Sequence, residues 1–203
     1  MEWNYEYDVV VVGSGNGALT AALCSHDGGA KTLVIEKSSQ FGGTSATSGG
    51  GVWIPNNRYA KAENVDDSDQ DARDYINSVS PEGMIKDELI ETYISEGPRM
   101  VDYLHENSQV KYRNLAHYPD YFPDNTGGKE GNRSMEPEPI FGTELGDDLG
   151  NLREQHPQTA FTMGPINMNF TQVEGQLLLG ALPGWKTQFA KLFTKYILDF
   201  TMR

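Results

Sequence analysis

The sequence predicts an α/β fold in which a Rossmann-like βαβ unit precedes a helical and loop-rich segment. Three observations predict it. A short run of β-branched residues lies at 7–12, a glycine-rich stretch follows at 13–18, and helical periodicity dominates after residue 62. Almost no strand pattern follows residue 62. Because a doubly wound sheet needs three or more strands, we expect an incomplete sheet and an N-terminal piece of a longer protein.

The first element is the run Tyr7–Val12, which is typical of a strand buried on both faces and therefore of a parallel sheet. A small-residue helix over 19–25 should follow, with Cys24 in its core-facing side, and Gly28 and Gly29 should end it. A second strand is expected over Lys31–Glu36. Together these elements form one βαβ unit with a right-handed crossover.

The remaining elements are mostly helical. After a glycine- and serine-rich loop at 38–57, apolar residues recur with helical spacing over 69–79, 84–96 and 98–106, and Pro98 would lie in the first turn of the third helix. Residues 107–165 should form loops with one short strand near 110–115, and 185–200 an amphipathic helix that faces the core or another subunit. We therefore divide the chain at 1–62, 63–165 and 166–203, the middle part bordering a substrate pocket.

Composition excludes several classes of function. The 203 residues carry 29 acidic and 16 basic side chains, a net charge of −13, which disfavours nucleic acid as a partner and gives no strong signal for anionic membranes. A single cysteine permits neither an internal disulfide nor a cysteine-based metal site, and no metal is expected. The first residues are acidic, unlike a secretory signal, and no apolar run could span a membrane, so a cytoplasmic protein is expected.

The glycine pattern predicts a dinucleotide site. Gly13 permits a tight turn, Gly15 lets backbone approach a pyrophosphate, and Ala18 is small enough for close helix–strand packing. Glu36 ends the next strand 21 residues after Gly15, where a carboxylate accepts from a ribose hydroxyl. Such a carboxylate repels a 2′-phosphate, which disfavours NADP but leaves both NAD and FAD open.

A second glycine-rich stretch favours a flavin. The stretch from Phe41 to Pro55 offers backbone N–H groups and small hydroxyl side chains, with no bulky residue until Trp53. A cradle of this kind just after the ribose carboxylate suits a long, flat cofactor approached by backbone. A flexible linker is the alternative, but Val52–Ile54 continues directly into hydrophobic sequence.

The motifs together resemble a known family. GSGNGALTAAL, VIEK and FGGTSATSGGGVWIP are similar to the N-terminus of the FAD-dependent fumarate reductase/succinate dehydrogenase flavoprotein superfamily, and within it to bacterial 3-ketosteroid dehydrogenases. The segment YPDYFPDNTGG followed by GNRS is similar to a second segment of those dehydrogenases. Family members are well over twice this length. Ala18 stands where many of them have glycine, which the fingerprint tolerates.

The resemblance implies FAD as cofactor and assigns residues to it. The implied cofactor-binding residues are Gly13, Ser14, Gly15, Ala18, Glu36, Lys37, Gly42, Gly43, Thr44, Ser45, Ser48, Gly49 and Gly50. Tyr121 matches a tyrosine that lines the family's steroid pocket, and is the candidate catalytic residue, although an aromatic that only covers the core is the equal alternative.

The resemblance implies oxidation of a small molecule, a 3-ketosteroid, by proton abstraction and hydride transfer to the flavin. A keto group acidifies the neighbouring C–H, a tyrosine takes that proton, and the flavin accepts hydride from the adjacent carbon. Three alternatives stay open. The protein could be another flavoprotein of the superfamily, such as a fumarate reductase or a Δ4-dehydrogenase, or a non-catalytic truncated FAD-binding piece. It could also be an interaction domain, although no sequence feature supports this.

Overall fold

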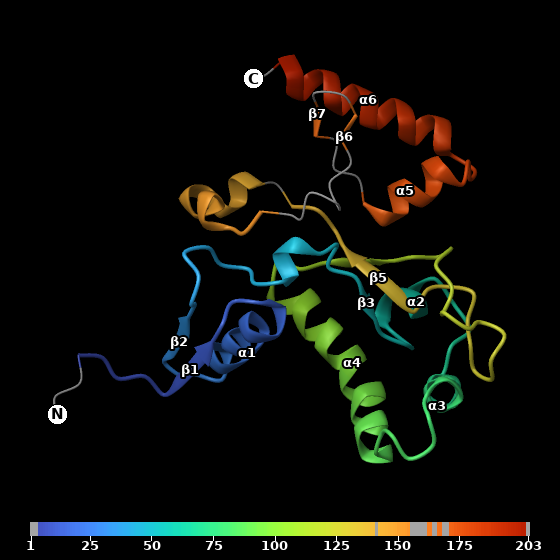
Figure 1. The fold of residues 1–203 in the computed structure, drawn as a ribbon, viewed down its shortest axis with the longest axis horizontal. Coiled ribbons are helices and arrows are strands. Elements are labelled where there is room, and N and C mark those ends of the chain that lie inside the picture. The colour runs from blue at the N-terminus through green and yellow to red at the C-terminus, as the bar shows by residue number, and fades with distance from the viewer. Residues whose placement is uncertain (1–3, 141, 155–161, 164–165, 168–170, 202–203) are drawn as a thin grey trace. The chain divides into compact units, whose positions relative to one another are not determined.

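The computed structural model describes residues 4–140, 142–154, 162–163, 166–167 and 171–201 (Figure 1). The chain divides into two compact units. Unit 1 comprises residues 1–50 and 139–160, and unit 2 comprises residues 51–138 and 161–203. Each unit contains part of the candidate functional machinery.

Unit 1 contains the predicted βαβ motif. Strand β1 (Val9–Val12) leads into helix α1 (Asn16–Asp27), and strand β2 (Thr32–Ile35) returns parallel to β1, with Val9 opposite Thr32 and Val12 opposite Ile35. The amides of Gly28 and Gly29 bond to carbonyls in the last turn of α1 and end the helix. The parallel βαβ unit is therefore confirmed.

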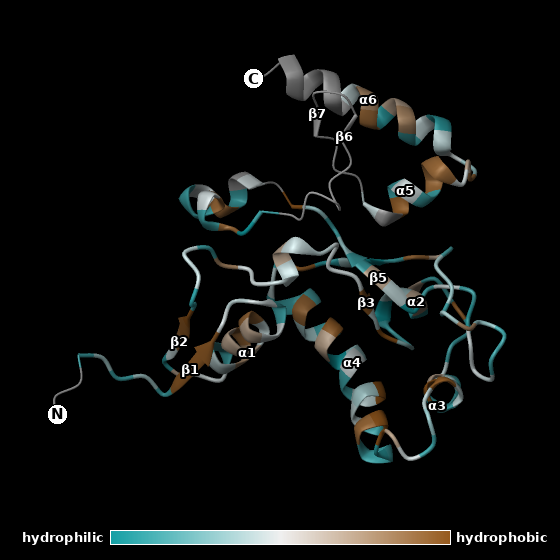
Figure 2. Cartoon of the chain, in the orientation of Figure 1, coloured by the Kyte–Doolittle hydropathy of each residue, from teal (hydrophilic) through white to brown (hydrophobic). Residues whose placement is uncertain are grey.

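Burial in this motif is lower than the sequence predicts. The side chains of β1 alternate between half-buried and exposed, and Val12 is 78% exposed. Figure 2 shows both strands as hydrophobic. Because alternate side chains of β1 are exposed, the prediction of burial on both faces is wrong for this chain. Cys24, expected in the core, is exposed on α1.

Two further segments complete unit 1. A 3-10 turn, η1 (Ser45–Thr47), lies within the second glycine-rich stretch, and the 3-10 segment η2 (Gly142–Asn151) kinks at Gly146. Phe41 bonds to this distant segment at two points, accepting from Arg153 N and donating to Asn151 O, each at 2.9 Å. The start of the second glycine stretch is thus fixed by chain about 110 residues later.

Unit 2 is built around a three-stranded antiparallel sheet in the order β3 (Val52–Trp53), β5 (Ser134–Pro137), β4 (Tyr112–Asn114). Its first helices are α2 (Arg58–Ala62), α3 (Asp69–Val79) and α4 (Asp87–Asn107). The strands β6 (Thr162–Met163) and β7 (Ile166–Asn167) and the helices α5 (Gln172–Leu179) and α6 (Trp185–Thr201) follow. Helix α3 and the short strand near 110–115 confirm their predictions.

The described hydrophobic core lies in unit 2. Ala72 on α3 packs with Ile90 and Ile94 on α4, and Ile76 joins this cluster from the side. Other buried apolar side chains come from the sheet, its flanking loops and the C-terminal half of α4, and they include Ile54, Val101, Leu104, Leu115 and Met135. The periodic apolar residues that predicted α3 and the first half of α4 are the residues that bury this surface.

Helix α4 corrects another expectation. The sequence predicted separate helices before and after Pro98, but a single helix runs through it. Pro98 cannot donate to the carbonyl four residues earlier, which normally ends or kinks a helix. Here Gly97 is buried against Ile54, and an added Cβ would lie 3.2 Å from the Ile54 Cδ1 atom. Packing on both sides of the proline holds the two halves as one helix.

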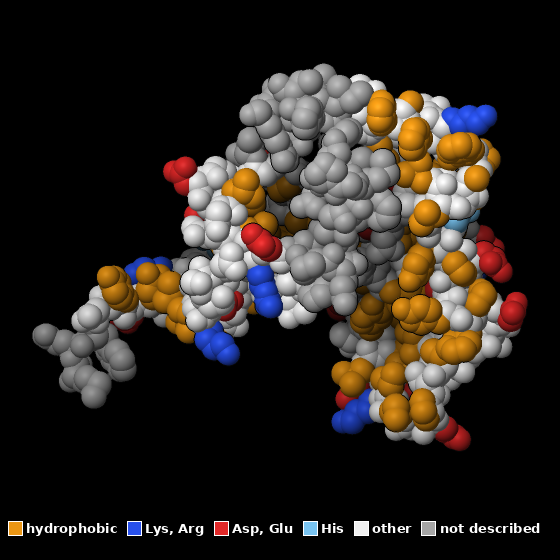
Figure 3. Space-filling model, turned by 45° about the horizontal axis from the view of Figure 1, so that its top comes forward, with side chains coloured by type: hydrophobic (Ala, Val, Ile, Leu, Met, Phe, Trp, Pro, Cys, Tyr) orange, Lys and Arg blue, Asp and Glu red, His pale blue; other side chains and the backbone are white. Residues whose placement is uncertain are grey.

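The predicted C-terminal amphipathic helix is present as α6. Leu192 is buried, whereas Phe189 and Phe193 remain about half exposed and stack on each other. Figure 3 shows apolar side chains at the surface among scattered charges. No helix among the described residues is long and apolar enough to cross a membrane.

Candidate functional site

The N-terminus of α1 forms an open set of backbone donors in unit 1. Gly13, which precedes it, has a φ of +97°, a conformation that favours glycine. Gly15 caps the helix without a side-chain hydrogen bond, and the first turn contains no acidic residue. A Cβ placed on Gly13 or Gly17 would meet no atom within 4 Å. The positive end of the helix therefore faces open space, as an anion site requires.

The second glycine stretch packs against this turn. Gly43 has a φ of +54°, and a Cβ there would lie 3.3 Å from the N and Cα atoms of Gly15. Gly42, with a φ of +106°, would place a Cβ only 2.7 Å from that of Ala46. The Ser45 hydroxyl accepts from Asn16 N at 3.0 Å. Glycine at positions 42 and 43 thus permits two loops to meet at the helix N-terminus.

Ser14 joins both loops to Glu36. This buried side chain donates to the Glu36 Oε2 atom and accepts from Gly42 N at 2.9 Å. The Ser38 amide donates to the Glu36 Oε1 atom at 2.8 Å. The bond from Ser14, followed by that from Ser38, lowers the pKa of the Glu36 carboxyl. Glu36 is therefore an exposed, ionised acceptor in a fixed orientation beside the glycine turn.

The other predicted cofactor residues differ in how they are held. Ser48 donates to Ser45 O at 2.9 Å and accepts from Gly50 N at 3.1 Å, which closes the turn after η1. Ala18 lies in the first turn of α1. Lys37, Thr44 and Gly49 are exposed. We call the loops 13–18, 36–38 and 42–50 the glycine cradle.

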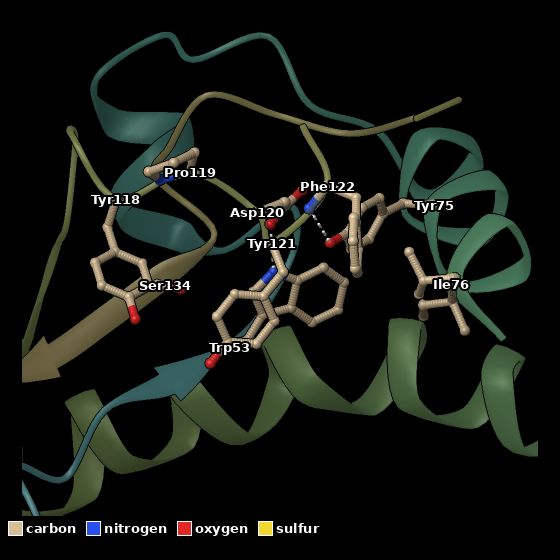
Figure 4. A pocket seen from close by; sticks show the side chains of 10 residues that line it. Trp53, Tyr75, Ile76, Tyr118, Pro119, Asp120, Tyr121, Phe122 and Ser134 are labelled. Carbon is tan, nitrogen blue, oxygen red and sulfur yellow. Dashed lines mark hydrogen bonds between the residues drawn. The ribbon is translucent and has the colours of Figure 1, made fainter. Parts of the chain in front are cut away.

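A second candidate site lies in unit 2. It is a pocket of about 330 Å³ lined by Trp53, Tyr75, Ile76, Val79, Tyr118, Pro119, Asp120, Tyr121, Phe122 and Ser134 (Figure 4). Its size is within the range of small-molecule sites, roughly 300–1,000 Å³. The lining is predominantly aromatic and aliphatic, and none of these ten residues is Lys or Arg. Such a surface suits an apolar ligand rather than a dicarboxylate.

The aromatic lining combines fixed and free rings. The Trp53 ring lies near the rings of Tyr75 and Tyr93, with ring centroids 5.9 and 6.2 Å away. Tyr121, the predicted catalytic residue, is 83% exposed, and its hydroxyl makes no hydrogen bond with a described residue. A ring so exposed covers no core, so packing within these units does not account for Tyr121. The structure places it on the pocket wall.

The sequence reasoning missed part of this pocket. From the sequence, Trp53 is only the bulky residue near the end of a glycine-rich loop and Tyr75 lies within the helix predicted over 69–79, while Asp120 and Arg133 are only parts of a matched segment. Arg133 is buried and pairs with both Asp67 and Asp120. The signal that could have found it is an arginine inside a glycine-rich loop of an acidic segment. Among the described residues, no cluster of His, Cys, Asp or Glu could hold a metal ion.

Comparison with known proteins agrees with this geometry. Residues 8–185 match the family model described as FAD binding domain. The chain is 42% identical over 203 residues to a 3-oxosteroid 1-dehydrogenase of Comamonas testosteroni, covering 98% of this chain and 34% of that protein. It is 38% identical over 157 residues to a 4-oxocyclohexanecarboxylate 2-dehydrogenase of Sinomonas cyclohexanicum, covering 77% of this chain and 27% of the relative.

A solved structure extends the likeness to three dimensions. The 3-ketosteroid Δ1-dehydrogenase of Sterolibacterium denitrificans, crystallised with 1,4-androstadiene-3,17-dione, superposes with a TM-score of 0.86 at 40% identity. The match covers 97% of this chain and 34% of that structure. The chain thus spans about a third of the length of these relatives. It belongs to the FAD-binding domain family of flavoproteins, and it is a homologue of the 3-ketosteroid dehydrogenases.

Proposed function

We propose that this chain forms the adenosine-binding cradle and one wall of the substrate pocket of an FAD-dependent 3-ketosteroid dehydrogenase. The observation that carries the proposal is the joint arrangement of a helix N-terminus with glycine as its N-cap residue, two glycine loops in contact, and the ionised Glu36 beside them. The relatives with the highest identity reported above have the same activity in their names. In this proposal residues 1–62 bind cofactor, 63–165 border the pocket, and 166–203 begin the part that completes it.

The residues of the cradle fit the adenosine and pyrophosphate portions of FAD. The space beside Gly13 and Gly17 is open, and the backbone N–H groups of Gly17 and Ala18, next to the Asn16 amide that Ser45 accepts from, suit a pyrophosphate. Glu36, held by Ser14 and Ser38, would accept hydrogen bonds from ribose hydroxyls. The backbone and hydroxyls of residues 42–50 would contact the rest of the cofactor. Lys37, Thr44 and Gly49 join this set by resemblance alone.

The chemistry assigned to this chain is the binding and deprotonation of a ketone. The aromatic pocket would bind the apolar rings of the steroid, and contact of those rings with the aromatic lining would favour a fixed orientation. Tyr121 is exposed, so its phenol proton can pass to solvent, and the resulting phenolate oxygen would accept the proton from the carbon beside the keto group. When bound, FAD supplies the acceptor for the hydride that leaves the adjacent carbon, so that the substrate gains a C=C bond.

A second substrate class is a smaller cyclic ketone that carries a carboxylate, as the name of the Sinomonas relative indicates. Such a substrate requires a cation to pair with its carboxylate. The ten lining residues include no cation, and Asp120 adds negative charge to the wall. The lining therefore favours the steroid over the oxo acid and over fumarate.

Direct binding to the chain tests the proposal. Titration with 4-androstene-3,17-dione should quench tryptophan fluorescence, because Trp53 lines the pocket, and Trp53→Phe should remove most of the quenching. 4-Oxocyclohexanecarboxylate is the matched competitor. Tighter binding of the oxo acid than of the steroid would overturn the assigned substrate class, and FAD binding measured separately would show whether the cofactor assignment stands.

A further inference from the structure

Asp120 lines the pocket beside Tyr121 and bonds to Trp53 (Figure 4). Its Oδ1 atom accepts from the Trp53 indole Nε1 at 2.6 Å, and its Oδ2 atom accepts from Arg133 Nη1 at 2.9 Å and from Lys129 N at 3.0 Å. The backbone of Asp120 also donates to Lys129 O at 2.9 Å. One carboxylate therefore holds both the Trp53 ring and the loop that carries Tyr121.

Arg133 is fixed at its other end by a second carboxylate. Its Nε and Nη2 atoms donate to Asp67 at 3.1 and 2.7 Å, a two-point contact that a planar guanidinium makes well. The guanidinium carbon also lies 5.5 Å from the Trp53 ring centroid and 5.7 Å from that of Tyr75. The side chains of Arg133 and Asp120 are each 2% exposed. Solvent does not compete with these bonds.

The two backbone neighbours of Tyr121 are both held. Asp120 precedes it, and the amide of Phe122, which follows it, donates to the Tyr75 hydroxyl at 3.3 Å. The Tyr121 side chain itself is exposed and unbonded to the described residues. These bonds fix the backbone at Tyr121 and leave its hydroxyl available to a ligand.

From this arrangement we infer that Arg133, acting through Asp120, is a positioning residue for Tyr121 and for the Trp53 floor of the pocket. This inference rests on the proposed function. An ionised carboxylate is needed because Trp53, Arg133 and Lys129 are all donors and an asparagine offers one acceptor atom and one donor group. In either orientation of its amide, an asparagine at position 120 would point its NH2 group at another donor, either the Trp53 indole or the Arg133 and Lys129 N–H groups.

Asp67 provides a matched control. Asp67 and Asp120 are similarly buried, and each pairs with Arg133, but only Asp120 precedes Tyr121. In the ¹⁵N-labelled chain, Asp120→Asn and Asp67→Asn should lower the melting temperature by similar amounts. Amide hydrogen exchange at Phe122 and Lys129 should be about tenfold faster in Asp120→Asn than in Asp67→Asn. Equal exchange rates in the two variants would overturn the inference.

A ligand measurement gives the second arm. The dissociation constant for 4-androstene-3,17-dione should rise about tenfold in Asp120→Asn and at most about threefold in Asp67→Asn, with FAD affinity unchanged in both. If the unmodified chain binds no steroid, the proposed function fails, and the exchange comparison still decides the positioning role. Should Asp120→Asn fail to fold, Arg133→Lys takes its place. Lysine keeps the positive charge but cannot bond to Asp67 and Asp120 at the same time as the guanidinium does. Amide exchange at Phe122 and Lys129 should therefore again be about tenfold faster than in Asp67→Asn. Equal exchange rates would overturn the inference.

Discussion

The glycine cradle of unit 1 and the aromatic pocket of unit 2 achieve their geometry by opposite means. In the cradle the buried side chain among the site residues is the polar Ser14, and backbone approach at Gly42 and Gly43 brings the loops together. The pocket stands on a hydrophobic core and on the buried pairs of Arg133 with Asp67 and Asp120. None of the buried hydrophobic side chains of the described structure belongs to unit 1.

Because of this difference, the two sites should depend on their ligands to different degrees. A site with open backbone donors and little core gains stability when an anion binds it, because a ligand that binds only the folded state shifts the folding equilibrium. A site on a packed core is preformed and depends less on its ligand. The cradle should therefore respond to cofactor, and the pocket to substitutions in the network beneath it.

The largest effect is expected from Arg133→Met, which leaves two buried carboxylates without their cation. Breaking a buried ion pair in this way costs about 3–5 kcal/mol of unfolding free energy. Urea unfolding followed by tryptophan fluorescence measures it. Arg99→Met is the control, because Arg99 pairs with Glu96 on an exposed face of α4 and should change stability by less than about 0.5 kcal/mol. Equal losses in the two variants would mean that the network does not support unit 2.

Tyr121→Phe tests the chemical part of the pocket. In a flavoprotein that contains this chain and oxidises 4-androstene-3,17-dione, the variant keeps the ring and removes only the hydroxyl. We expect kcat to fall by roughly 10–10³-fold, within the range of acid–base contributions, with flavin content and melting temperature unchanged. Phe122→Leu, which leaves the Tyr121 hydroxyl in place, should lower kcat much less. Undiminished turnover by Tyr121→Phe would leave Tyr121 as a contact residue without a role in proton transfer.

Glu36→Ala should weaken FAD binding by about 1–3 kcal/mol, the cost of losing a charged hydrogen-bond partner. Isothermal titration calorimetry measures the change. Glu6→Ala removes another exposed carboxylate of unit 1 and should bind FAD as the unmodified chain does. The ribose assignment fails if the two variants bind FAD equally well.

A smaller, acid-dependent effect is expected in both units. Hydrogen bonds from Ser14, Lys129 and Arg73 lower the pKa of Glu36, Asp71 and Glu91, respectively. Because these pKa values are lower in the folded state, the unfolded chain binds protons first as pH falls. The contribution is therefore complete above the ordinary pKa of about 4 and is lost as pH drops through the lowered values.

Thermal melts across pH test this sign. The melting temperature should be nearly constant from about pH 8 to pH 5.5 and decline below about pH 4.5. Glu91→Gln should flatten part of the decline, since it removes one of the three groups. An acid response that is identical in this variant would show that the Arg73–Glu91 pair contributes nothing.

The sequence predicted the cradle better than the pocket for a physical reason. Strand, glycine turn, helix and Glu36 lie within 30 residues, and local spacing alone brings them together. The Ser14 bond that orients Glu36 required the structure, because it spans 22 residues between two loops. In the pocket, Trp53 reaches Asp120 across 67 positions, and Arg133 reaches Asp67 across 66. No periodic pattern encodes such pairs.

Two elements of unit 2 show tertiary packing overriding local preference. Strand β5 has the sequence SMEP, which carries no strand signal, yet it is the middle strand of its sheet, and Met135 is fully buried there. Pro98 predicted a break that the packing of Gly97 against Ile54 prevents. Where periodicity was strong and uninterrupted, as in α3, the bounds 69–79 matched the prediction.

The most direct test of the central claim is an NMR titration of the ¹⁵N-labelled chain with FAD, ADP and FMN. We predict that ADP and FAD both shift the amides at residues 13–18 and 36–38, that only FAD also shifts those at 42–50, and that ADP leaves the amides around Trp53 and Tyr121 in place. FMN, which lacks the adenosine half, should leave the amides at 36–38 in place. Equal responses to FMN and ADP, or no response of the cradle to FAD, would contradict the assignment of this chain as the adenosine-binding part of a flavoprotein.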